Sequence, residues 1–203
     1  MKKLLILALA VFGLTVYAKD VNSQDLVMKD GLVYLKKSNV EFTGNSLSFY
    51  KNGLIHKKVP YYQGLMDGRL TEWDQDGNIK IFAYFRDGKQ NGEYIKKYKN
   101  GKNAVVAYFK HGKQHGEVRT WYSNGAKKSL SYYKYDVQDG EAKTWHENGK
   151  MATSIYYTDG QKNGEYLQWH SNGRLAYQAR YVNGKVRGEI LAWNSNGVRV
   201  IQK

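Results

Sequence analysis

Short runs of aromatic and β-branched residues alternate with polar residues along most of the chain, and glycines separate these runs at fixed distances. The run GEVRTWYSNG at 116–125 has counterparts 24 residues earlier at 92–101 and 24 residues later at 140–149. The first glycine of this unit recurs without an insertion at Gly44, Gly68, Gly92, Gly116, Gly140, Gly164 and Gly188. A fixed period of this length indicates a repeat array, here six full units and part of a seventh.

Each unit predicts a β-hairpin followed by a second tight connection. An x-Asn-Gly step joins two runs of five or six residues, and glycine reaches positive φ without steric cost. The glycines also leave no segment long enough for an amphipathic helix. We therefore predict an all-β protein, built as a single-layer array of antiparallel hairpins with a 24-residue period.

Residues two apart in a strand share a face, which predicts two sets of aromatic side chains. We expect the first set to be buried: the tryptophan column Trp73, Trp121, Trp145, Trp169 and Trp193, with the rings Tyr61, Phe85, Phe109, Tyr133, Tyr157 and Tyr181. We expect the second set to face outward as a candidate binding stripe: Tyr84, Tyr98, Tyr108, Tyr122, Tyr132 and Tyr156. This assignment assumes a three-residue hairpin loop with a glycine bulge. The alternative is that the single layer curls and both sets become partly buried.

The ends of the chain differ from the array. Residues 1–18 have a basic start, an apolar run from Leu4 to Val16 and a small-x-small site at Val16-Tyr17-Ala18, the pattern of a cleaved export signal. This run is short for a membrane span, so we expect no integral membrane segment after cleavage. Residues 19–43 predict a capping hairpin around Asp30-Gly31, because a solenoid needs an atypical end. The array then occupies residues 44–203.

The charge of the chain is strongly positive, with 32 Lys and Arg against 18 Asp and Glu and a formal net charge of +14. Removal of Lys2 and Lys3 with the signal leaves +12. An exported basic protein suggests an anionic surface of the cell envelope as a partner, and we expect no nucleic-acid binding. The chain has no cysteine, which excludes a lipid-modified cysteine, a disulfide and a thiolate metal site.

The unit Y-x-N-G, then an aromatic residue followed by x-x-G-K-x-x-G, resembles the MORN repeat in its bacterial variant. The cap with Asp30-Gly31-Leu32-Val33-Tyr34, followed by Phe42-Thr43-Gly44, is similar to YwqK-like antitoxins. The resemblance implies a single layer of hairpins and a protein that binds a partner. Lys97 at an aromatic position and Asp136 at a glycine position depart from the pattern.

The polar residues do not suggest a catalytic or metal site. His146 and His170 occupy the same position in consecutive units, about 10 Å apart across two strand spacings. That separation is too large for one zinc ion, whose Zn–N distance is about 2 Å. Glu93, Glu117, Glu141, Glu165 and Glu189 recur with the period, which indicates charges at turns because a catalytic site needs a unique residue. We expect no enzyme activity, no metal and no cofactor.

These observations favour an exported, non-enzymatic binding or scaffold protein that is periplasmic, surface-located or secreted. It would engage a protein partner or an anionic envelope polymer through one face of its sheet. The alternative is an antitoxin or immunity protein that neutralises a cognate toxin by direct binding, as the resemblance implies. The oligomeric state is left open.

Overall fold

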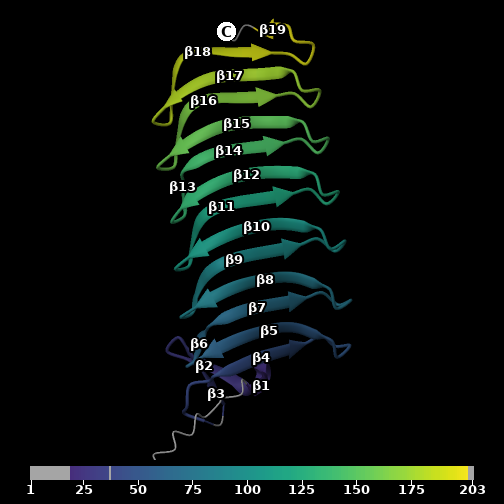
Figure 1. Cartoon of the computed structure of the whole chain (residues 1–203), viewed down its shortest axis with the longest axis vertical. Coiled ribbons are helices and arrows are strands. Elements are labelled where there is room, and N and C mark those ends of the chain that lie inside the picture. Colours follow the sequence, from purple (N-terminus) through teal and green to yellow (C-terminus); the bar gives the residue numbers. More distant parts are fainter. Residues whose placement is uncertain (1–18, 37, 201–203) are drawn as a thin grey trace, which may run out of the picture.

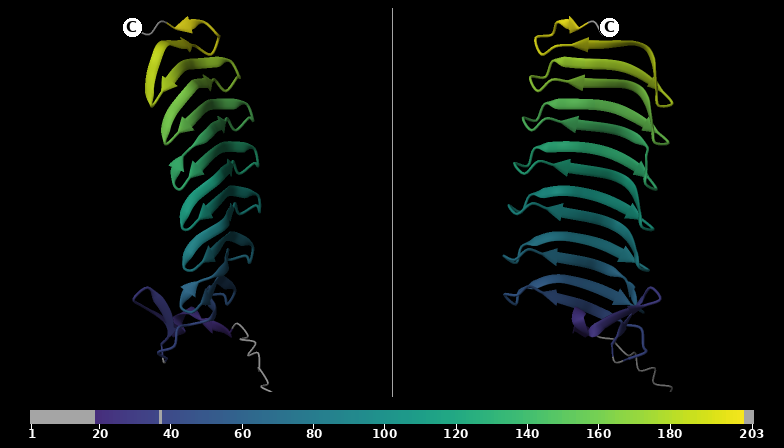
Figure 2. Two further views of the ribbon diagram at one scale, coloured as in Figure 1. Left: turned by 60° about the vertical axis from the view of Figure 1, so that its left-hand side comes forward. Right: turned by 180° about the vertical axis from the view of Figure 1, so that it is seen from behind.

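The computed structural model describes residues 19–36 and 38–200 and shows one long sheet of consecutive hairpins (Figure 1). Seventeen strands belong to this sheet, and a separate two-stranded sheet lies at the N-terminal end. Figure 2 shows the strands as a single layer stacked along the long axis of the molecule. The all-β fold class predicted from the sequence is therefore confirmed.

Two strands and two connections make up each 24-residue unit. The strands of the array are β4 (Gly44–Phe49), β5 (Ile55–Tyr62), β6 (Leu65–Met66), β7 (Gly68–Trp73), β8 (Ile79–Arg86), β9 (Lys89–Lys97), β10 (Asn103–Lys110), β11 (Lys113–Trp121), β12 (Lys127–Lys134), β13 (Val137–Gln138), β14 (Gly140–Trp145), β15 (Met151–Thr158), β16 (Gln161–Trp169), β17 (Leu175–Val182), β18 (Lys185–Trp193) and β19 (Arg199–Val200). Neighbouring strands of the array pair antiparallel throughout.

The x-Asn-Gly hairpins have the three-residue loop on which the assignment of the two faces depended. In the β11–β12 hairpin the Tyr122 N–H donates to the Ala126 carbonyl over 2.9 Å, and the Gly125 N–H donates to the Tyr122 carbonyl over 2.9 Å. Gly125 closes the loop at φ 93°, in the region where glycine has no steric penalty. The other connection is a two-residue turn with positive φ at both residues, as at Asp87 and Gly88. That geometry is typical of a type I′ hairpin.

A second irregularity follows each three-residue loop and reverses the predicted faces. Thr120 pairs with Ser129, but its neighbour Trp121 pairs with Lys127, so Lys128 is an extra residue in β12. The corresponding register shift occurs in all six x-Asn-Gly hairpins that join β4 through β17. A one-residue shift moves the rest of a strand to the opposite face. The predicted division into a buried set and an outward set is therefore wrong.

The observed faces combine members of both predicted sets. The tryptophan face carries the five tryptophans together with Tyr84, Tyr108, Tyr132 and Tyr156. In the β11–β12 hairpin, for example, Glu117 lies four residues before Trp121 in the same strand and so shares its face, and Tyr132 pairs with Glu117. The alanine face carries Ala83, Ala107, Ile155 and Ala179 together with the rings Phe85, Phe109, Tyr133, Tyr157 and Tyr181. The tryptophans are half-buried rather than buried.

Most of the buried positions of the array form a column on the alanine face, in which small and large side chains oppose each other. The opposed pairs are Ser46 with Val59, Leu70 with Ala83, Tyr94 with Ala107, Val118 with Ser131, Ala142 with Ile155, and Tyr166 with Ala179. Ala107 is 2% exposed and Ala179 is 1% exposed. A single layer can exclude water at these positions because each small residue lies under a larger neighbour.

The N-terminal segment lies against the first hairpin of the array. β1 (Lys19–Asn22) pairs parallel with β4, and a 3₁₀ turn (Ser23–Asp25) leads to the predicted hairpin of β2 (Leu26–Lys29) and β3 (Leu32–Leu35). Val21, Val33 and Phe42 form a buried cluster at this end. A side chain at Gly64 would lie 3.1 Å from the Val33 nitrogen, so the close contact between this segment and the array requires glycine there. The predicted export signal, residues 1–18, lies outside the described residues.

Candidate functional site

The six tyrosines predicted to form one binding stripe lie on both faces. Tyr84, Tyr108, Tyr132 and Tyr156 belong to the second strands of their hairpins and lie on the tryptophan face. Tyr98 and Tyr122 lie at the x-Asn-Gly edge on the alanine face, where the Lys128 ammonium is 5.5 Å from the centre of the Tyr122 ring. The single stripe predicted from the sequence is therefore two separate rows.

Tyr98 and Tyr122 have a structural role. The Tyr98 hydroxyl donates to the Trp121 carbonyl over 2.7 Å, and the Tyr122 hydroxyl donates to the Trp145 carbonyl over 2.9 Å. Both bonds connect one repeat to the next. These two side chains are half-buried and already have partners, so they are poor candidates for binding another molecule.

Three tyrosines of the tryptophan face, Tyr84, Tyr108 and Tyr156, are exposed, and two, Tyr108 and Tyr132, are hydrogen-bonded to carboxylates. Tyr108 is 41% exposed and Tyr156 is 52% exposed. The Tyr132 hydroxyl donates to Glu117 Oε2 over 2.9 Å, and the hydrogen bond with this carboxylate raises the pKa of the Tyr132 phenol. The negative charge of Glu93 likewise raises the pKa of Tyr108. Both phenols thus remain neutral hydrogen-bonding groups at physiological pH.

Close packing holds two of these tyrosines, Tyr84 and Tyr132, against the first glycine of the following unit. A side chain at Gly140 would lie 2.9 Å from the Tyr132 Cβ, and one at Gly92 would lie 3.1 Å from the Tyr84 Cβ. Glycine is thus needed at these two positions for the tyrosine of the preceding unit to keep its observed place. This contact orients the ring while leaving its outer side open.

A hollow of about 430 Å³ lies on the tryptophan face between two consecutive repeats. Its lining includes Trp121, Trp145, Leu130, Tyr132, Glu117 and Arg119. Arg119 forms an ion pair with Glu117, and the Lys127 ammonium lies 5.9 Å from the centre of the Trp145 ring. The hollow thus combines aromatic surfaces with a carboxylate and a guanidinium, and tryptophan, tyrosine and arginine are the residue types that dominate binding energy at protein interfaces.

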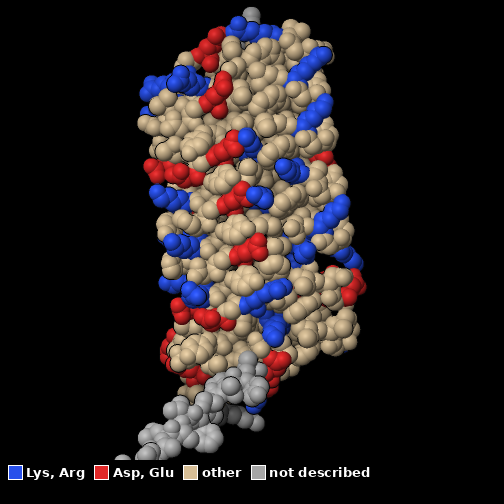
Figure 3. Space-filling view, viewed as in Figure 1, with Lys and Arg blue, Asp and Glu red and all other residues tan. Residues whose placement is uncertain are grey.

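Acidic side chains form a row along this face. Figure 3 shows them down the middle of the molecule over β9, β11, β14 and β16, with basic side chains beside some of them. The row consists of Glu93, Glu117, Glu141 and Glu165, and Lys143 pairs with Glu141 as Arg119 does with Glu117. Glu117 and Trp121 lie four residues apart in one strand and therefore share a face, whereas the place of these glutamates beside the tyrosines follows only from the observed register.

Within the described residues, no group of three or more His, Cys, Asp or Glu side chains is arranged to hold a metal ion. No helix in this part of the chain is long and apolar enough to cross a membrane. The candidate site is the open aromatic and charged surface of the tryptophan face.

Comparison with known families concerns three consecutive units of the array. Three consecutive units, residues 114–135, 138–159 and 162–183, match the family model of the MORN repeat variant. The other units of the array share their period and hydrogen-bond pattern with these MORN repeats. No curated protein matches the chain. The MORN match supports a repeat-based binding or scaffold role, whereas the similarity to YwqK-like antitoxins stays a prediction from sequence.

Proposed function

We propose that this protein is an exported binding protein without enzymatic activity, and that it holds a protein partner on its tryptophan face. The observation that carries the proposal is the row of half-buried tryptophans and exposed tyrosines that runs from repeat to repeat on one open face. Tryptophan, tyrosine and arginine combine large contact area with polar groups, and they are enriched among residues that dominate protein–protein binding.

The charges of the tryptophan face support a protein partner over an anionic polymer. The glutamate row places negative charges along the tryptophan face, although the chain as a whole is basic. Glu117 and Glu141 are paired with cations, so a protein surface with both charge signs fits this face better than a uniformly anionic one. The repeats place equivalent groups roughly 10 Å apart along the sheet, which suits an extended contact over several units.

Export rests on the sequence of residues 1–18 and determines where the partner is to be sought. Lys19, the first residue predicted to remain after cleavage, is also the first residue of β1, which pairs with β4. Cleavage before Lys19 would leave this strand and the whole sheet intact. The partner is thus expected in the cell envelope or outside the cell.

The test is capture of envelope proteins by the immobilised mature chain and by two variants. Tyr108→Ser combined with Tyr156→Ser removes two exposed rings from the tryptophan face. Tyr135→Ser serves as the matched control, because Tyr135 is 40% exposed but lies in a turn at the edge of the sheet. The proposal expects a specific protein to be retained by the control and lost from the double variant.

Equal capture by both variants would refute the role of the tryptophan face, and capture of acidic polymer alone would refute the choice of partner. If the retained protein is a toxin, the function is the neutralisation that the resemblance to antitoxins implies. Circular dichroism of each variant verifies that the sheet is unchanged.

A further inference from the structure

A row of ring side chains connects the repeats along the x-Asn-Gly edge of the alanine face. In each case the ring belongs to the residue after the tryptophan position, and its polar atom contacts the backbone carbonyl at the tryptophan position of the next repeat. The contacts are Tyr50 with Trp73 at 2.7 Å, Tyr98 with Trp121 at 2.7 Å, Tyr122 with Trp145 at 2.9 Å, His146 with Trp169 at 2.9 Å and His170 with Trp193 at 2.8 Å. One junction in this series lacks its ring.

Asp74 occupies the missing position. Its carboxylate accepts hydrogen bonds from the Asp76 N–H over 3.0 Å and the Asn78 N–H over 2.9 Å, so it is directed back into its own turn. The hydrogen bond from Asn78 lowers the pKa of Asp74, which keeps this group an acceptor at neutral pH. Lys97 stands at the tryptophan position of the next repeat. Because the Asp74 carboxylate can only accept hydrogen bonds, it cannot bond to the Lys97 carbonyl. In the described structure this carbonyl receives no side-chain donor of the kind found at the other junctions.

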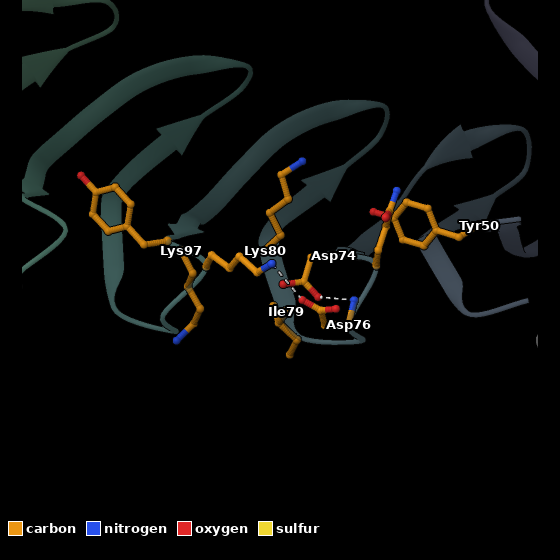
Figure 4. A pocket seen from close by; sticks show the side chains of 9 residues that line it. Tyr50, Asp74, Asp76, Ile79, Lys80 and Lys97 are labelled. Atoms are coloured by element: carbon orange, nitrogen blue, oxygen red, sulfur yellow. Dashed lines mark hydrogen bonds and ion pairs between the residues drawn. The ribbon is translucent and has the colours of Figure 1, made fainter. Parts of the chain in front are cut away.

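The short side chain leaves a hollow of about 360 Å³ between two repeats. Figure 4 shows Asp74 beside the open space, with Tyr50 of the preceding repeat on one side. The lining also includes Ile79, Lys80, Lys97 and Tyr98. A cavity of about 150 Å³ is enough to hold a benzene ring, so this hollow has room for a phenol.

The cation that would cover a ring is also in place. In the fourth unit the Lys128 ammonium lies 5.5 Å from the centre of the Tyr122 ring. Lys80 occupies the equivalent position in the second unit, where there is no ring, and its ammonium bonds to Glu72 over 3.0 Å instead. A phenol in the hollow would therefore find a carbonyl acceptor, a nearby cation and aromatic neighbours, as Tyr122 does in its own unit.

We propose that this hollow is a binding site for a tyrosine side chain of a protein partner, which restores the missing ring of the row. The hydroxyl of the bound phenol donates to the Lys97 carbonyl, and its ring lies beside Lys80. The site lies at the x-Asn-Gly edge, where Asp74 belongs to the alanine face and Ile79 and Lys97 to the tryptophan face, and it includes none of the tyrosines assigned to the partner on the tryptophan face. It differs from every other junction of the array because Asp74 stands where the others carry a tyrosine or a histidine.

The test uses the mature chain and two capped tripeptides, Gly-Tyr-Gly and Gly-Phe-Gly, with p-cresol as a free phenol. Binding is followed by changes in the amide resonances of residues 97–99. We expect the tyrosine peptide and p-cresol to bind, and the phenylalanine peptide to bind about three- to tenfold more weakly because it lacks the donor for the carbonyl.

Asp74→Tyr supplies the ring within the chain and should abolish binding of both phenols. Asn194→Tyr is the matched control, because Asn194 caps its own turn as Asp74 does but lies at the end of the array, and it should leave binding unchanged. Equal binding of the two peptides, or binding that survives in Asp74→Tyr, would overturn the proposal. Binding of p-cresol without the tyrosine peptide would show that the site takes a small phenol rather than a protein side chain.

Discussion

The opposition of small and large side chains on the alanine face can be tested with a pair of compensating substitutions. Ala107 is almost fully buried and lies opposite Tyr94, whose ring contacts Phe109 at 6.3 Å between ring centres and 72° between planes. Ala107→Ile inserts a larger side chain beneath that ring. Overpacking of this kind costs about 1–3 kcal/mol, and we expect about 2 kcal/mol.

The second substitution, Tyr94→Ala, removes the ring that overpacking would strain. A fully buried aromatic residue changed to alanine costs about 3–5 kcal/mol, and the half-buried Tyr94 should cost about 2 kcal/mol. The double variant reproduces the arrangement of the fifth unit, where Ile155 lies opposite Ala142. Because the inserted isoleucine fills the space that the ring vacates, we expect a loss of about 2 kcal/mol in the double variant instead of about 4 kcal/mol.

Urea unfolding followed by circular dichroism measures these free energies. The control is a double variant that combines Ala107→Ile with Ile95→Ala. Ile95 pairs with Val106 and points to the tryptophan face, so it does not contact the inserted isoleucine. The losses of Ala107→Ile and Ile95→Ala should add to within about 0.5 kcal/mol. If the losses of Ala107→Ile and Tyr94→Ala also add, the two side chains are not packed as described and the account of the core is wrong.

Three further predictions concern export, a tryptophan and pH. N-terminal sequencing of the periplasmic or secreted protein should give Lys19 as the first residue, and retention of Met1 would contradict cleavage. Trp145→Ala should lower the free energy of unfolding by about 2 kcal/mol, because Trp145 is half-buried; a urea melt showing 4 kcal/mol or more would place it in a core. Burial raises the pKa of Tyr157 and Tyr166, so the unfolded chain loses these protons first and the melting temperature should fall as pH rises above about 10. Tyr166→Phe should reduce this alkaline fall, and an unchanged fall would exclude a contribution from Tyr166.

The sequence by itself determined the architecture, because its signals are local. The 24-residue spacing of the glycines and the x-Asn-Gly steps predicted the hairpins, the loop at Gly125 and the absence of long helices. Glycine and asparagine set these turns through their own backbone preferences, without reference to distant residues. The hairpin around Asp30-Gly31 followed from the same kind of signal.

Only the tertiary structure decided which side chains share a face. The extra residue at Lys128 and its equivalents shifts the register by one, and this shift brings Tyr132 to the same side as Trp145 and places Tyr122 on the other. Such a bulge depends on pairing between strands and leaves no distinct residue type in the repeat. The same register sets Tyr94 opposite Ala107 and leaves a hollow at Asp74, so the core, the candidate binding face and the proposed tyrosine site all depend on contacts between strands.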